Sequence, residues 1–105
     1  MAYNVDVENI ANELDFDVED IEMLLEVFLE SSKESLEQME DALNSNDLET
    51  LYQNAHGIKG SASNILLNDI SDIAKDIELN AKKNIDMDYK GKVAELSNLI
   101  NSIEC

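Results

Sequence analysis

The sequence predicts an all-α protein, an up-down-up-down four-helix bundle with a short additional N-terminal helix. Three observations predict this class. The 105 residues include no proline and only three glycines, whereas Ala, Leu, Ile, Glu, Asp and Lys together make up more than half of them, a composition typical of helices with few tight turns. Apolar residues recur every three or four positions along most of the chain. The connections between these periodic segments are short, so neighbouring helices should run antiparallel.

The first two periodic segments differ in length. A short amphipathic helix opens the chain, and Asp15-Phe16-Asp17 ends it. Asp17 can cap a second helix, which runs from about Val18 to Leu43, roughly 40 Å, and which Ser31-Ser32 could bend. The apolar positions of the first helix are Val7, Ile10, Ala11 and Leu14. The inward positions of the second are Ile21, Leu25, Phe28, Ser32, Leu36, Met39 and Leu43.

A stop and restart signal at Asn44-Ser45-Asn46-Asp47 leads into the third helix. Asn46 can cap this helix, and Glu49 is placed to complete a capping box. Its one-sided stripe is Leu48, Leu51, Ala55, Ile58, Ala62 and Ile65. At about 100° per residue, His56 lies roughly 120–130° from the centre of this stripe. The side chain of His56 should therefore face solvent or a rim of the bundle.

Two further helices complete the predicted bundle. After a connection around Leu66-Leu67-Asn68, the inward positions of the fourth helix are Ile70, Ile73, Ala74, Ile77 and Ala81. Lys82 and Lys83 suit the negative end of its dipole. The last helix presents Tyr89, Val93, Leu96, Ile100 and Ile103. No alternating run supports a strand, and no linker interrupts the chain, so residues 1–105 should form a single domain.

The composition excludes several classes of function. The net charge of −17, from 24 acids against seven lysines, disfavours binding to nucleic acid or to an anionic membrane. No apolar run is long enough to cross a bilayer, and the N-terminus lacks the features of a signal peptide. The single cysteine, Cys105, cannot form an internal disulfide, which suits a reducing cytosol. We therefore expect a cytoplasmic protein, and we expect it to be a monomer.

His56, the only histidine, is the main candidate for chemistry. One nitrogen of a neutral imidazole can attack phosphorus while the other keeps its proton on an acceptor such as a carboxylate. Lys59, at i+3, offers a cation beside any phosphoryl group on the ring. Gly60, at i+4, is the helix neighbour whose side chain would otherwise crowd the ring. A mid-helix glycine costs about 0.5–1 kcal/mol relative to alanine, so it suggests clearance for a closely approaching partner.

His56 could also be an ordinary surface residue, and the sequence lacks the motifs of a metal or nucleotide site. An exposed histidine near a lysine is common on helices, and periodicity alone favours this ordinary surface role. One histidine and a terminal cysteine do not make a zinc site, and Lys90 and Ser97 break the ligand set of a calcium loop that begins at Asp86. No glycine loop cradles a nucleotide. We expect neither a kinase active site nor a bound metal or cofactor.

The segment Ala55–Ile65 resembles the His-x-x-Lys-Gly-Ser signature of histidine phosphotransfer (HPt) domains, and the resemblance extends over nearly the whole chain. Phe28-Leu29-Glu30, Asn46-Asp47-Leu48-Glu49 and Ile77-Glu78 look like further elements of that family. The resemblance implies a four-helix bundle with His56 as phosphoacceptor. It also implies that Lys59 supports the phosphoryl group, that Gly60 gives clearance, and that Glu78 accepts the imidazole N–H and orients the ring.

The resemblance further implies a place in a multistep two-component phosphorelay. Members of the family pass phosphoryl groups between their histidine and an aspartate on receiver domains of response regulators or hybrid histidine kinases, and the Mg²⁺ of that chemistry belongs to the receiver. Leu66-Leu67 stands where the family usually has a small pair such as Gly-Ala, which leaves the local turn and packing open. The alternative function is a non-catalytic helical interaction module in which His56 is incidental.

Overall fold

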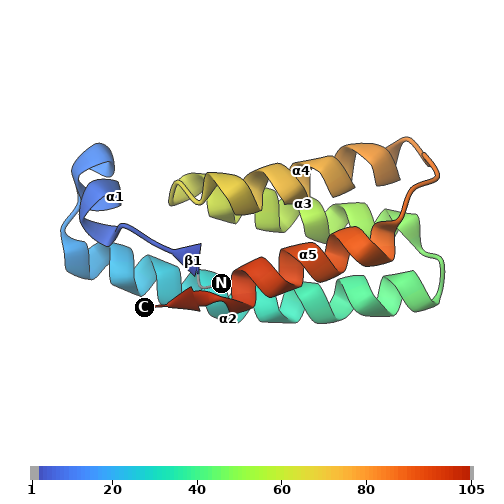
Figure 1. Cartoon of the computed structure of the whole chain (residues 1–105), viewed down its shortest axis with the longest axis horizontal. Helices are drawn as coiled ribbons and strands as arrows, with labels where there is room; N and C mark the ends of the chain where they lie inside the picture. The colour runs from blue at the N-terminus through green and yellow to red at the C-terminus, as the bar shows by residue number, and fades with distance from the viewer. Residues whose placement is uncertain (1–2, 105) are drawn as a thin grey trace.

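The computed structural model describes residues 3–104 and has the predicted all-α architecture. Its helices are α1 (Val7–Leu14), α2 (Val18–Asn44), α3 (Leu48–Asn64), α4 (Asn68–Lys82) and α5 (Tyr89–Asn101). In Figure 1, α2, α3, α4 and α5 run back and forth along the long axis, and α1 lies at one end beside the start of α2. The prediction for Cys105 lies outside the described residues.

The longest helix sets the dimensions of the bundle. α2 has 27 residues, about 40 Å at 1.5 Å per residue, and the molecule is 42 Å along its longest axis. α3 and α4 form the most extensive helix pair, and contacts of α5 with both α4 and α2 close the bundle. Within residues 3–104, no helix combines the length and the apolarity that a membrane crossing requires.

The buried residues of α2 follow the predicted stripe except near the end of the helix. Ala42 is buried, whereas Leu43, which was predicted to point inward, is only half-buried. The two positions lie on either side of the stripe, because three residues after Met39 fall about 60° short of a full turn and four residues pass it by about 40°. Met23, which lies outside the stripe, is 65% exposed. Ser31-Ser32 do not interrupt α2, and the Ser31 hydroxyl donates a hydrogen bond to the carbonyl of Phe28.

The cap of α3 also differs from the prediction. Asp47, not Asn46, occupies the N-cap position, and its carboxylate accepts hydrogen bonds from the Thr50 backbone N–H (3.1 Å) and hydroxyl (2.6 Å). Asn46 has φ 55°, a left-handed conformation that asparagine tolerates better than most residues. The predicted capping box between Asn46 and Glu49 is therefore wrong, because the better acceptor follows one residue later.

A pair of very short strands, which the sequence pattern did not predict, joins segments near the two ends of the chain. β1 (Tyr3–Asn4) pairs in parallel with β2 (Ile103–Glu104). Ile103 was predicted in the last helix, but α5 ends at Asn101. Two residues per strand are too few for an alternating pattern, so only the proximity of the chain ends reveals this pairing.

Leu66 and Leu67 form the turn between α3 and α4. Leu66 has φ 59°, which explains why a glycine would suit this position. Its side chain packs against a small cluster of Ile10, Ala11 and Ile21, which joins α1 to α2. Leu67 is 1% exposed and belongs to the main core. The two leucines therefore connect the turn to both clusters.

We expect the substitution Leu66→Gly to loosen α1 while changing overall stability little. Glycine adopts the left-handed backbone conformation without the strain of roughly 1 kcal/mol that leucine bears there. The loss of the Leu66 side chain from its cluster with α1 and α2 destabilises the fold by a similar amount. Amide hydrogen exchange should show faster exchange in α1, with the free energy of unfolding by urea within about 1 kcal/mol of wild type.

Asn84→Gly is the matched control, because Asn84 is exposed and has φ 55° at another turn. It should leave exchange in α1 unchanged. If amide exchange in α1 were equally slow in Leu66→Gly and Asn84→Gly, the packing of Leu66 would not be what holds α1 in place.

Candidate functional site

His56 lies in the middle of α3 on the side opposite the core. Its side chain is 65% exposed, whereas Ala55 and Ile58 beside it are at most 2% exposed. This orientation agrees with the one predicted from helical periodicity. The ring is therefore reachable by another macromolecule.

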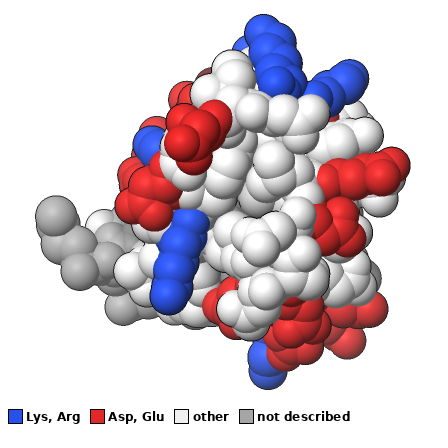
Figure 2. All heavy atoms as spheres, turned by 90° about the vertical axis from the view of Figure 1, so that its right-hand side faces the viewer, with Lys and Arg blue, Asp and Glu red and all other residues white. Residues whose placement is uncertain are grey.

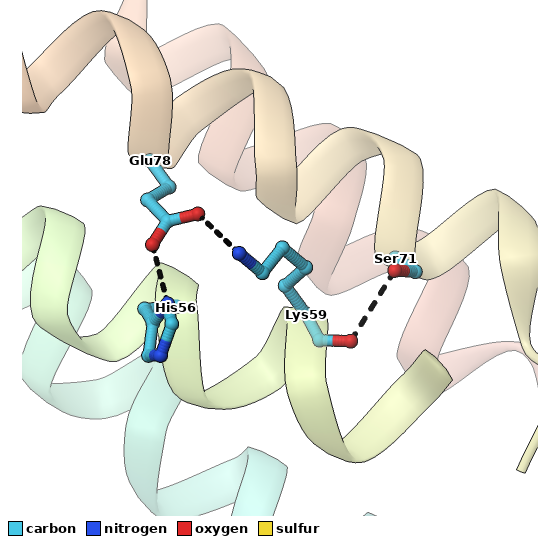
Figure 3. Close-up of polar contacts among 4 residues, drawn as sticks. All are labelled: His56, Lys59, Ser71 and Glu78. Atoms are coloured by element: carbon cyan, nitrogen blue, oxygen red, sulfur yellow. Dashed lines mark hydrogen bonds and ion pairs between the residues drawn. The ribbon is translucent and has the colours of Figure 1, made fainter. Parts of the chain in front are cut away.

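Glu78, on the facing helix α4, connects His56 to Lys59. Its Oε2 lies 2.5 Å from His56 Nδ1, and its Oε1 lies 2.7 Å from Lys59 Nζ. Figure 3 shows the carboxylate between these two side chains, with one oxygen directed to each. Glu78 is 8% exposed and is the only buried charged residue among residues 4–103. The structure therefore brings together three of the four predicted site residues.

The close approach of α3 and α4 makes this contact possible. Ala55 and Ala62 on α3 and Ala74 and Ala81 on α4 are at most 1% exposed, and small side chains at a helix contact permit a short interaxial distance. Ser71, at the start of α4, donates a hydrogen bond to the carbonyl of Lys59 at 3.2 Å, as Figure 3 shows. Sequence reasoning missed Ser71, and no local pattern could reveal a contact across twelve residues.

The environment of Glu78 determines which imidazole nitrogen carries the proton. Burial raises the pKa of Glu78, but hydrogen bonds from Lys59 and His56 outweigh burial, and the pKa lies below its ordinary value. An ionised carboxylate can only accept hydrogen bonds, so Nδ1 carries a proton and its N–H donates a hydrogen bond to Oε2. In the neutral imidazole, Nε2 then holds its lone pair on the exposed side, as a nucleophile requires.

Comparison with known proteins places this arrangement in a family. The chain matches the family model described as the Hpt domain over residues 23–104. The chain belongs to the Hpt domain family. Hpt domains are helical bundles that carry phosphoryl groups in two-component phosphorelays, without kinase activity of their own, and interact with receiver domains. No curated protein and no solved structure gives a significant match.

The two glycines around His56 face open space in this Hpt domain. A β-carbon built at Gly57 or Gly60 would meet no atom within 4 Å. The expectation that a side chain at position 60 would crowd the ring is therefore wrong at the level of the β-carbon. Gly91 is different, because a β-carbon there would lie 2.3 Å from Asp88 Oδ2. Contacts within the folded chain thus disfavour a side chain at position 91 but not at position 60.

A shallow pocket of about 360 Å³ opens beside His56. Its lining residues are Tyr52, Gln53, His56, Glu78 and Lys82. Tyr52, Gln53 and Lys82 were missed as site residues, although helical spacing could have found them, since they lie one turn from His56 or Glu78. Among residues 3–104, no group of three or more His, Cys, Asp or Glu side chains is arranged to hold a metal ion.

We expect Glu78→Gln to reduce the free energy of unfolding by about 1–3 kcal/mol at pH 7, because it removes a buried carboxylate that accepts hydrogen bonds from both His56 and Lys59. The lowered pKa gives the contribution of Glu78 a definite sign. It is fully present above the ordinary value of 4.5 and is lost as pH falls through the lower folded-state pKa. The difference between wild type and variant should therefore shrink towards pH 3.

Urea unfolding at pH 7 and pH 3 measures this difference. Glu26→Gln, at an exposed position of α2, is the control for removing one acid from a strongly acidic chain. A difference for Glu78→Gln that is independent of pH, or equal to that of the control, would contradict the assignment.

Proposed function

We propose that this Hpt domain accepts a phosphoryl group on Nε2 of His56 and passes it to or from an aspartate of a receiver domain. One observation carries the proposal. Glu78 engages Nδ1 at 2.5 Å while the His56 side chain remains 65% exposed, so the second nitrogen is available to an aspartyl phosphate of a partner.

In the transfer to His56, the lone pair of Nε2 attacks the phosphorus atom of the aspartyl phosphate. The N–P bond forms, the O–P bond breaks, and the aspartate leaves as a carboxylate with the electron pair. The Nδ1 proton stays in its hydrogen bond to Glu78, whose negative charge stabilises the positive charge that develops on the ring. The reverse steps return the group to an aspartate, and Mg²⁺ in this chemistry belongs to the receiver.

The roles of Lys59 and Gly60 are part of the same proposal. Lys59 supports the phosphoryl site, and in the unphosphorylated protein its ammonium holds Glu78 at 2.7 Å, which fixes the carboxylate that orients the ring. Gly60 leaves space for the receiver to bring its aspartate close to Nε2, in keeping with the open space around its Cα.

We expect the substitution His56→Gln to abolish phosphorylation. Wild-type protein incubated with a ³²P-labelled phospho-receiver should gain an acid-labile label, because phosphoramidates hydrolyse in acid. His56→Gln should gain none, because no other histidine is present, and should keep its far-UV circular dichroism. Label retained in this variant would refute the assignment and favour the interaction module, in which receiver binding occurs without transfer.

The receiver needs a docking surface, and we propose the exposed apolar strip of α2. This strip comprises Met23, Leu24 and Val27, which are 65%, 40% and 62% exposed. Leu24 and Val27 line a groove shared with Ser61 and Asn64 of α3, which follow His56 on the exposed part of that helix. Adjoining exposed apolar residues of this kind are typical of protein interfaces.

The double substitution Met23→Ser and Val27→Ser should weaken receiver binding at least about tenfold, because the apolar contact area is lost. Isothermal titration calorimetry with the receiver measures the dissociation constant. Ile85→Ser is the control, since Ile85 is an exposed apolar residue (44%) in the α4–α5 turn. Equal affinities of the double variant and the control would move the docking surface elsewhere.

We also propose that residues 1–105 act as one monomeric domain in the cytoplasm. The main core runs continuously through α2, α3, α4 and α5, and a net charge of −17 opposes self-association. The single cysteine is in keeping with a reducing compartment.

A further inference from the structure

Lys82 lies on α4 near His56. Along this helix it follows Glu78, whereas Ser71 precedes Glu78. It follows Glu78 by four residues on α4, one helical turn, and lines the pocket that also contains His56, Tyr52 and Gln53. Figure 2 looks onto the end of the bundle where α4 ends, and lysine side chains project at its upper edge, the side on which α4 lies in Figure 1.

The two lysines near His56, Lys59 and Lys82, differ in their ion pairing. Lys59 forms an ion pair with Glu78 at 2.7 Å and is 29% exposed. Glu78 accepts hydrogen bonds from His56 and from Lys59, and no ion pair joins it to Lys82, although a Glu–Lys pair at i, i+4 is favourable on a helix. None of the ion pairs formed within residues 3–104 involves Lys82. Its ammonium is therefore available to an incoming anion.

The pocket has room for a phosphoryl group. Its volume of about 360 Å³ compares with roughly 30 Å³ for one water molecule in the liquid. A phosphoryl group on His56 brings up to two negative charges next to Glu78, which is itself ionised. Lys59 is shared between Glu78 and the phosphoryl site, so a second cation near the ring would stabilise the additional negative charge.

We propose that Lys82 is a phosphoryl-contacting residue, whose ammonium binds the phosphoryl group carried by Nε2 of His56. This inference deepens the proposed function and rests on it for its biological meaning. The chemical test does not need a receiver, because phosphoramidate can phosphorylate the single histidine directly. In that reaction the P–N bond of phosphoramidate breaks, ammonia leaves, and the bond between Nε2 and phosphorus forms.

Lys82 also lies in the last turn of α4, where a cation favours the helix dipole. Lys83 is the matched control for this simpler role. It lies at the same helix end, is exposed, and does not line the pocket. A change seen in Lys82→Gln but not in Lys83→Gln therefore reports on the phosphoryl group rather than on the helix end.

The experiment follows the ³¹P resonance of the phosphorylated proteins as a function of pH. A nearby ammonium favours the dianionic phosphoryl group, so its loss in Lys82→Gln should raise the proton affinity of the phosphoryl group about two- to fivefold, as expected for a partly exposed ion pair. Lys82→Arg should keep the wild-type titration, and Lys83→Gln should also match wild type. Far-UV circular dichroism checks that all variants are folded.

A second measurement uses the transfer equilibrium with a receiver. The equilibrium constant for transfer relates the free phosphorylated and unphosphorylated proteins, so a contact made only in the docked complex does not affect it. Loss of a contact with the phosphoryl group does affect it. Lys82→Gln should therefore shift this constant about two- to fivefold towards the phosphorylated receiver. Titrations of Lys82→Gln and Lys83→Gln that coincide would overturn the role of Lys82. Failure of wild-type protein to accept label from any receiver, with the ³¹P difference intact, would instead overturn the proposed function alone.

Discussion

The carboxylate of Glu78 is the interaction on which the rest of the site depends. A charged group this deeply buried is costly unless its hydrogen-bonding capacity is used, and here each oxygen has one partner, His56 or Lys59. The carboxylate therefore does two things at once. It fixes the tautomer and orientation of the imidazole, and it ties α4 to α3 at the point where the phosphoryl group would be carried.

The packing of the two central helices follows from this requirement. Glu78 reaches across to α3 only because alanines lie between the helices, at Ala55 and Ala62 on one side and Ala74 and Ala81 on the other. Larger side chains would move the helix axes apart and lengthen both hydrogen bonds. α3 and α4 also form the most extensive helix contact of the bundle. The most extensive helix contact of the molecule is thus the one that positions His56.

The surface around His56 is divided by chemistry. On one side lie the charged side chains of Glu78, Lys59 and Lys82. On the other side lie the bare glycines of α3 and then the exposed apolar strip of α2. Most of the acids lie in the first half of the sequence, which carries sixteen acids and one lysine. Such a surface disfavours non-specific association with anionic nucleic acid and membranes, and the apolar strip interrupts this acidic surface on α2.

The sequence by itself determined the helices, their antiparallel order and the outward orientation of His56, because hydrophobic periodicity is a local property of each segment. The candidate partner Glu78 came from the family resemblance, since nothing in the period of α4 distinguishes it from its neighbours. Only the tertiary structure decided that Lys59 binds Glu78, that Ser71 meets the carbonyl of Lys59, and that Leu66 adopts a left-handed conformation against α1. These contacts depend on the rotation and separation of packed helices, which a one-dimensional pattern does not contain.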